Sequence, residues 1–290
     1  MDAARPLDPD LPPEIDKALR RLREGMAEAC LSEFSFTNLY LFRREHDYRY
    51  LAGEHPCVSG RTYDGARHLL PLFPLHEAPP ATLCRLLAEH DCFYPLAHSQ
   101  VARLDPQCFA ASASRDDADY LYRADSFRHY RGSVLAKKRN LMKQLLASGS
   151  VRASRYSQAW HADALAVLEG WMADKGKQPG EADQLAGIEA LARADQLGLE
   201  GFVYHLDGQP AGFLLAEEVQ AGVFVMRFAK GLDAFKGIYQ YMFQHFCASF
   251  DRPVHWLNFE QDLGMANFRH TKLSYQPAAL LSKFRVRPAR

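Results

Sequence analysis

The residues of this chain that could do chemistry gather near its C-terminus, in the segment 256–264, Trp-Leu-Asn-Phe-Glu-Gln-Asp-Leu-Gly. An apolar run typical of a buried strand stops at Asn258, and Glu260, Gln261 and Asp262 follow it. If the strand continues, the carboxylates of Glu260 and Asp262 share one face. They could bind the ammonium group of an amino acid, or one could act as a general base once desolvation raises its pKa. We expect Asn258 to hold a carbonyl and Gln261 to bind substrate, and the alternative is a strand end followed by a solvated turn.

A second pair of candidates follows within the same segment. Lys272 and Tyr275 are three residues apart, so they share a face if the chain forms a helical turn there. Lys272 could counter a carboxylate or an oxyanion, and Tyr275 could donate a proton late in a reaction. In the alternative, structural interpretation, Lys272 pairs with Glu260 or Asp262.

The main basic segment lies at residues 130–146, where the spacing predicts a helix. Its apolar stripe consists of Val134, Leu135, Leu141, Met142, Leu145 and Leu146. Lys138 falls inside this stripe. Its ammonium group must therefore form an ion pair, reach solvent at the end of its extended side chain, or point into a water-filled cleft. Lys138, Arg139 and Asn140 are therefore candidates for contact with a phosphate-rich ligand such as the acceptor end of a tRNA.

An aromatic segment at 34–42, Phe-Ser-Phe-Thr-Asn-Leu-Tyr-Leu-Phe, contains a polar pair. The structural interpretation is a helix start, with Ser35 as the cap and the aromatic residues in the core. In the functional interpretation, Asn38 and Tyr40 line a groove between two halves of the protein.

Three separated motifs support a family resemblance: Asn-Phe-Glu-Gln-Asp-Leu-Gly followed by Lys-Leu-Ser-Tyr-x-Pro at 258–277, the segment 34–42, and Lys-Lys-Arg-Asn at 137–140. Together they resemble the C-terminal catalytic domain of phosphatidylglycerol lysyltransferases and its stand-alone relatives, over most of residues 30–287. The resemblance implies an α/β (α+β) fold of tandem acetyltransferase-like (GNAT) type, with two mixed sheets flanked by helices. It also implies that an aminoacyl group moves from charged tRNA to a lipid or small-molecule acceptor, so the tRNA acceptor end and lipid at a membrane surface are the expected partners.

Two Asp-Gly dipeptides, at 64–65 and 207–208, lie between apolar runs and predict β-hairpins, because such turns need positive φ. Each hairpin begins a series of strands, then a helix, then a strand, which favours two similar halves, 1–149 and 150–290, joined near 148–150. The expected elements are a helix at 81–90 and a strand at 92–97, then helices at 160–172, 184–197 and 237–250 with strands at 223–229 and 254–259. We expect the second half to carry the site.

The loop 230–237 begins the helix at 237–250 and offers Lys230, Lys236 and Gly237. In an acetyl-CoA-dependent transferase, a Gly-rich loop at this place gives backbone N–H groups to a pyrophosphate. Here the dense glycine pattern is missing, so no cofactor is certain and acyl-CoA-dependent N-acyltransfer is the second hypothesis. The two lysines could instead contact the phosphates of a larger ligand, or simply lie exposed at a capped helix start.

Composition limits the classes of partner. The chain has 35 Lys and Arg against 35 Asp and Glu, so its formal net charge is zero. Any binding of nucleic acid or anionic lipid therefore needs a local basic patch. Six scattered cysteines without metal-ligand spacing predict reduced, mostly buried thiols in a cytoplasmic protein, and no metal. The segment 1–13 has no signal-peptide pattern, and no apolar window reaches the roughly 20 residues of a transmembrane helix. A non-catalytic binding module is the third hypothesis.

Overall fold

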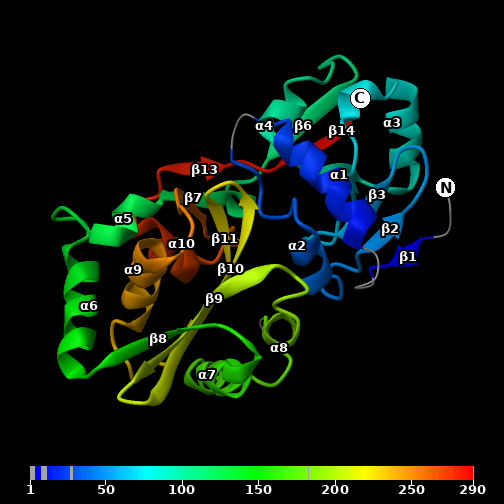
Figure 1. The fold of residues 1–290 in the computed structure, drawn as a ribbon. Helices are drawn as coiled ribbons and strands as arrows, with labels where there is room; N and C mark the ends of the chain where they lie inside the picture. Colours follow the sequence, from blue (N-terminus) through cyan, green and yellow to red (C-terminus); the bar gives the residue numbers. More distant parts are fainter. Residues whose placement is uncertain (1–3, 8–11, 27–28, 182, 290) are drawn as a thin grey trace. The chain divides into compact units, whose positions relative to one another are not determined.

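The computed structural model describes residues 4–7, 12–26, 29–181 and 183–289 (Figure 1). Much of the segment 1–13, for which the sequence predicts no signal peptide, lies outside the described residues. Internal contacts divide the chain into two compact units. Unit 1 consists of residues 1–119, 261–269 and 280–290, and unit 2 of residues 120–260 and 270–279. The sequence analysis predicted two similar halves, 1–149 and 150–290, which are not the same segments as these two units. The division into halves stays a prediction.

Unit 1 contains a seven-stranded sheet in the order β1-β2-β3-β4-β5-β14-β6. The strands are β1 (Arg5–Pro6), β2 (Arg49–Leu51), β3 (Cys57–Arg61), β4 (Arg67–Pro71), β5 (Cys92–Leu96), β6 (Phe109–Ala113) and β14 (Phe284–Pro288). The helices are α1 (Pro12–Glu24), α2 (Phe36–Leu41), α3 (Pro80–Leu86) and α4 (His98–Val101), with 3₁₀ turns at Leu75–Glu77, Leu87–Glu89 and Arg115–Asp117. Because β4 and β5 run parallel and their neighbours antiparallel, the sheet is mixed.

Unit 2 contains a second seven-stranded sheet, in the order β13-β7-β12-β11-β10-β9-β8. The strands are β7 (Asp119–Arg123), β8 (Val151–Arg155), β9 (Leu199–Leu206), β10 (Gln209–Gln220), β11 (Val223–Gly231), β12 (Trp256–Asn258) and β13 (Ala279–Leu281). The helices are α5 (Ala124–His129), α6 (Ala136–Ser148), α7 (His161–Asp174), α8 (Gln184–Ala192), α9 (Ile238–Ser249) and, from residue 270 on, α10 (Ala266–Leu273), with a 3₁₀ turn at Gln158–Trp160. This sheet is also mixed, because β11 and β12 run parallel while β9, β10 and β11 form an antiparallel meander.

Both predicted hairpins are confirmed. The dipeptide 64–65 joins β3 to β4, and the dipeptide 207–208 joins β9 to β10. Asp207 and Gly208 have φ of 48° and 81°, the pair of positive values that a tight two-residue hairpin turn requires. Local turn chemistry therefore sets the strand register at 207–208, while at 64–65 only Gly65, at φ 83°, has a positive φ.

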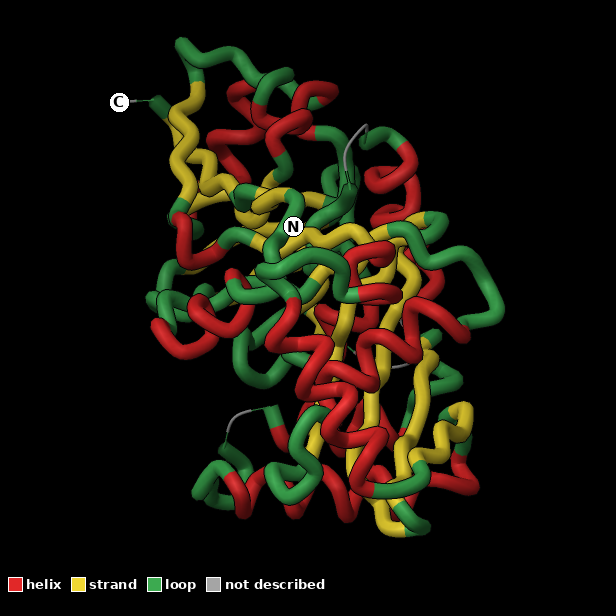
Figure 2. The backbone as a smooth tube through the Cα atoms, turned by 90° about the vertical axis from the view of Figure 1, so that its left-hand side faces the viewer, coloured by secondary structure: helices red, strands yellow, loops and turns green. Residues whose placement is uncertain are grey.

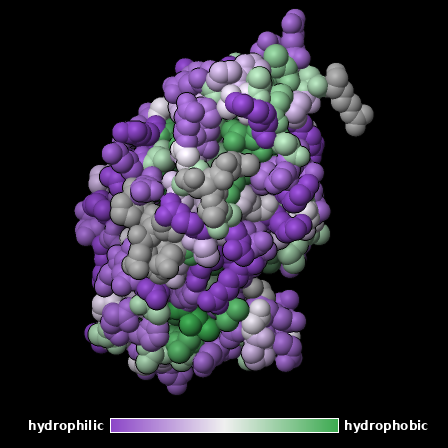
Figure 3. All heavy atoms as spheres, turned by 90° about the vertical axis from the view of Figure 1, so that its right-hand side faces the viewer, coloured by the Kyte–Doolittle hydropathy of each residue, from purple (hydrophilic) through white to green (hydrophobic). Residues whose placement is uncertain are grey.

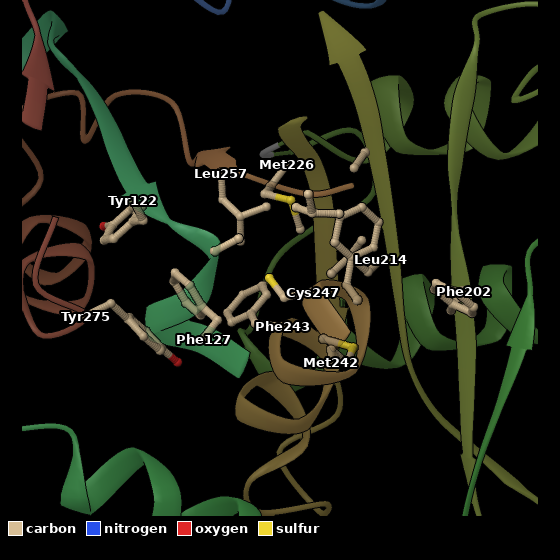
Figure 4. Close-up of a cluster of buried hydrophobic side chains, with 14 of the residues drawn as sticks. Tyr122, Phe127, Phe202, Leu214, Met226, Met242, Phe243, Cys247, Leu257 and Tyr275 are labelled. Carbon is tan, nitrogen blue, oxygen red and sulfur yellow. The ribbon is translucent and has the colours of Figure 1, made fainter. Parts of the chain in front are cut away.

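The core of unit 2 lies between the sheet and α9, as the close-up in Figure 4 shows. Met242 and Phe243 from α9 pack with Leu214 and Met226 from the sheet. The prediction that this helix is apolar nearly all round, and buried for that reason, is confirmed. Helices run alongside the long strands in the tube view (Figure 2), and hydrophilic residues cover most of the face drawn in Figure 3.

The structure decides one helix limit that the sequence left open, and it shows that another predicted limit is wrong. α6 begins at Ala136, and both Val134 and Leu146 of the predicted stripe are exposed. α8 ends at Ala192 and not at 197, because the chain turns through Gly198, at φ 61°, before entering β9. The first concerns the start of a helix and the second its end, and apolar spacing marks the buried face of a helix rather than its first or last residue. The prediction of mostly buried thiols is confirmed, since four of the six cysteines are buried.

Candidate functional site

The chain leaves the sheet of unit 2 directly after β12. Asn258 is fully buried, and its side-chain oxygen accepts a hydrogen bond from the Glu260 backbone N–H at 2.7 Å. Glu260 takes a left-handed φ of 57°. An Asn that bonds the backbone two residues ahead makes a local turn. The strand therefore does not continue through Glu260 and Asp262, so the condition under which their carboxylates would share one strand face is not met.

Glu260 belongs to a buried charge cluster with two residues that the sequence analysis missed. The side chain of Arg227 on β11 is fully buried, and its guanidinium lies 2.6 Å from Glu260 and 2.8 Å from Glu217 of β10. Burial alone would lower the pKa of Arg227, but the two carboxylates outweigh burial and raise it. The side chain of Glu260 is 21% exposed. Its carboxylate is therefore held in place by Arg227 and still reaches solvent.

Arg227 lies at an irregularity of the sheet. Leu215 pairs with Phe228, whereas Glu217 pairs with Val225, so β11 contains one more residue than β10 between these pairs. Such β-bulges re-aim a side chain and are common next to active sites. The sequence does contain a signal for this buried ion pair. Arg227 is the single charged residue in the apolar run 223–229, and a buried charge needs a partner.

The side chain of Lys272, on α10, binds the backbone of the turn that follows β12. Its ammonium donates to the carbonyl oxygens of Phe259, at 2.6 Å, and Glu260, at 3.1 Å. The Tyr122 hydroxyl in turn donates to the Lys272 carbonyl at 2.8 Å. The structure thus brings Lys272 to the backbone of the Glu260 turn, in a fixed position beside the candidate carboxylate.

Tyr275 forms a separate contact group with Lys138. The Tyr275 hydroxyl accepts a hydrogen bond from the Gln240 side chain at 2.7 Å, and its ring stacks on Phe127 (Figure 4). The Lys138 ammonium lies 3.9 Å from the centre of the Tyr275 ring, a cation–π geometry. Burial raises the pKa of Tyr275, and burial together with Lys137 lowers the pKa of Lys138. The apolar environment of Lys138 was predicted, but its aromatic partner was not.

Asp262 and Gln261 lie in unit 1 and are engaged there. The Asp262 carboxylate is fully buried, accepts hydrogen bonds from Arg269 at 2.8 Å and from the Gly264 N–H at 2.9 Å, and pairs with Arg115. These contacts shape the turn that leads into α10. The Gln261 side chain accepts a hydrogen bond from Lys283 at 2.6 Å. The structure does not gather these two side chains with Glu260, and the roles predicted for them stay predictions.

The other residues that were predicted to bind substrate lie in different environments. Arg139 donates to the backbone carbonyls of Tyr130 and Gly132, which fastens the segment before α6, while Asn140 is exposed. Asn38 is buried in α2, and the Ser35 side chain accepts a hydrogen bond from its backbone N–H, so the predicted Ser35 cap is confirmed. The groove role of Asn38 stays a prediction.

The loop before α9 does not fit the pyrophosphate of acyl-CoA. Lys230 is buried against Asp183, at 2.7 and 2.8 Å, and its ammonium lies 3.7 Å from the Trp171 ring centre. A β-carbon on Gly237, which has φ of 99°, would clash with the Leu141 carbonyl of α6, so this helix end is already covered. The backbone N–H groups of residues 231, 232, 233, 235 and 238 all donate within the protein. Of the two lysines that were predicted to contact phosphate, Lys236 is exposed and Lys230 is buried.

A buried cation in unit 1 was also missed. Lys283 is fully buried, with its ammonium 2.7 Å from Asp119 and 2.5 Å from Glu33. Its position beside Phe284 and after two leucines could have indicated burial. Within the ranges described, no group of three or more His, Cys, Asp or Glu side chains is arranged to hold a metal ion. None of the helices formed by the described residues has the length and apolar character needed to cross a membrane.

Comparison with known proteins gives a consistent result. The family model for the phosphatidylglycerol lysyltransferase C-terminal region matches residues 27–287. A conserved protein of unknown function from Bacteroides thetaiotaomicron superposes with a TM-score of 0.82 at 20% identity, covering 100% of both chains. L-PGS from Bacillus licheniformis gives 0.62 at 12%, covering 99% of this chain and 93% of that one. A tandem GNAT protein from the clavulanic acid biosynthesis pathway gives 0.52 at 10%, covering 99% and 98%. These structures confirm the predicted tandem GNAT-like fold. No curated protein matches the sequence.

Proposed function

This chain belongs to the family of the phosphatidylglycerol lysyltransferase C-terminal region, and we propose that it is an aminoacyltransferase. In this proposal it moves an aminoacyl group from charged tRNA to the amine or hydroxyl of a lipid or small-molecule acceptor. The observation that carries the proposal is the fixed pair at the end of β12: a partly exposed Glu260 carboxylate and a Lys272 ammonium anchored to the same turn.

The chemistry asks little more of the protein than this pair. An aminoacyl-tRNA ester is already activated, so positioning and one group that accepts and returns a proton suffice. The acceptor nucleophile attacks the ester carbonyl and its proton passes to Glu260. The bond to the tRNA 3′ oxygen then breaks, and Glu260 returns the proton to that oxygen as it leaves. Lys272 offers positive charge where the oxyanion develops. Arg227 keeps Glu260 oriented, and Glu217 balances part of the Arg227 charge.

Contact with the tRNA acceptor end is proposed for Lys138, Arg139, Asn140 and Lys236, as the sequence suggested. The exposure of Asn140 and Lys236 supports this assignment. Acyl-CoA-dependent transfer is the weaker proposal, because the helix end that should receive the pyrophosphate is covered by α6 and its neighbouring amides are engaged.

The test is transfer of radiolabelled amino acids from a mixed pool of charged tRNA, with purified protein and a cell extract separated into lipid and soluble fractions. We expect enzyme-dependent label to leave tRNA and to appear in one fraction, which identifies the acceptor class. Glu260→Gln preserves shape and should lower the rate by about 10²-fold or more if Glu260 accepts the proton. Glu169→Gln, on the exposed face of α7, is the matched control and should retain full activity. Equal rates in both variants, or no faster loss of label from tRNA than without protein, would overturn the proposal.

A further inference from the structure

Unit 1 contains a hollow that the proposed function does not use. It lies between the C-terminal end of α1, the segment 74–76 after β4, and the segment 99–103, which covers most of α4 after β5. β4 and β5 are parallel neighbours, and ligands of α/β sheets commonly bind beyond the carboxyl ends of such strands. The residues that matter for its chemistry are Arg21, His76, Gln100 and Arg103 on the polar side and Leu22 and Leu75 on the apolar side.

Gln100 supplies a donor that has no acceptor. Its side-chain oxygen accepts the Ala97 backbone N–H at 2.9 Å, which caps α4 and fixes the orientation of the amide. Its side-chain nitrogen is buried, and no described residue offers it a hydrogen-bond acceptor. Leaving such a buried donor unpaired is energetically costly. A ligand oxygen in the hollow would satisfy it.

The described residues that line the hollow carry positive charge or none. Arg21 and Arg103 border it from α1 and from the residues after α4, and the described lining contains no Asp or Glu. Among the residues that the structure describes, neither guanidinium takes part in an ion pair, whereas several other arginines of this unit do. His76 adds a further nitrogen donor. Two forked guanidinium groups beside an amide donor match the oxygens of a phosphate group.

We propose that this hollow binds a phosphate ester that carries an apolar group, with the phosphate held by Arg21, Arg103 and the Gln100 amide. The buried side chains of Leu22 and Leu75 provide the surface for the apolar part. The same chemistry occurs in a lipid headgroup with its first acyl carbons and in a soluble phosphate ester. The site goes beyond the proposed aminoacyl transfer and is tested by binding alone, so a failure of either proposal leaves the other standing.

The experiment is isothermal titration of the full chain with three probes: inorganic phosphate, glycerol 3-phosphate, and dihexanoyl phosphatidic acid below its micellar concentration. The variants are Arg21→Ala combined with Arg103→Ala, and Gln100→Glu. The second keeps the oxygen that caps α4 and replaces the unpaired donor with negative charge. Arg85→Ala, at an exposed arginine of α3 in the same unit, is the matched control.

We expect saturable binding, weakened at least about tenfold in both hollow variants and unchanged in Arg85→Ala, since a lost charge-assisted contact exceeds 1.4 kcal/mol. Tighter binding of the dihexanoyl probe than of the other two supports the apolar part of the proposal and assigns the ligand to lipid. Equal binding of all three overturns the apolar part, because the apolar group would then contribute nothing. Binding that both variants leave intact overturns the proposal. So does the absence of heat with every probe up to about 10 mM, where a Kd near 1 mM would already saturate.

Discussion

Replacing Lys283 by Met is the sharpest test of how unit 1 is held together. The Lys283 ammonium is fully buried and contacts Asp119 and Glu33, whose side chains are 0% and 10% exposed. It also donates to the Ser32 hydroxyl and to Gln261. Methionine preserves most of the side-chain volume but removes the charge, so the two carboxylates lose the buried cation that they share.

The size of the effect follows from burial. Removing one partner of a buried ion pair typically costs 3–5 kcal/mol, because the remaining charge is left unpaired in an apolar environment. For a domain of roughly this size, 1 kcal/mol lowers Tm by about 2–4 °C, so the expected decrease is about 6–20 °C. Lys175→Met is the matched control, since Lys175 lies 2.6 Å from Asp233 but on the surface. An exposed pair contributes only about 0–1 kcal/mol.

The deficit should also depend on pH. Burial raises the pKa of Glu33 above its ordinary 4.5, Lys283 lowers it in part, and Asp119 raises it. A carboxyl group with a raised pKa binds its proton more tightly in the folded state, so its contribution to stability is present at low pH and is lost as pH rises through the folded value. Removal of Lys283 raises the pKa of Glu33 further. We therefore expect the stability lost by the variant to be larger at about pH 8 than at about pH 5.

The measurement is urea unfolding at both pH values, followed by circular dichroism. Tryptophan fluorescence is unsuitable, because Trp160, Trp171 and Trp256 all lie in unit 2. A loss below about 1 kcal/mol at pH 8, equal to that of Lys175→Met, would refute the reasoning, since it would mean that water replaces the lost cation. A loss independent of pH would contradict the assignment of the effect to the carboxylates.

Three further predictions test unit 2 and the thiols. Gly237→Ala should destabilise the protein by at least about 2 kcal/mol in urea unfolding, because the new β-carbon would clash with a carbonyl of α6 at positive φ; no change would show that α6 moves away freely. Tyr275→Phe removes the hydroxyl that accepts the Gln240 amide, so we expect a loss of about 1–3 kcal/mol by the same assay, and a neutral result would mean that water enters. Cys84 is exposed, whereas burial raises the pKa of Cys57 to about 12, so a thiol reagent followed by peptide mass mapping should label Cys84 long before Cys57; equal labelling would contradict the burial.

The sequence determined the elements whose causes are local. Two Asp-Gly dipeptides predicted both hairpins, because only a few residue pairs accept the positive φ of a tight turn. An apolar run predicted that α9 is buried, and Ser35 predicted the start of α2. The order of these elements, together with three motifs, was sufficient to predict the tandem GNAT-like fold, which depends on the pattern of many residues rather than on any single contact.

Only the tertiary structure decided which charges are partners. Lys230 looked like a ligand for phosphate in the sequence, but it pairs with Asp183, 47 residues away. Glu260 and Asp262 looked like one acidic pair, but the Asn258 turn separates their environments and each has its own arginine. Lys283 reaches Glu33 across 250 residues. A charge carries no local pattern that names its partner, because the cost of burying it is met only when distant segments pack together.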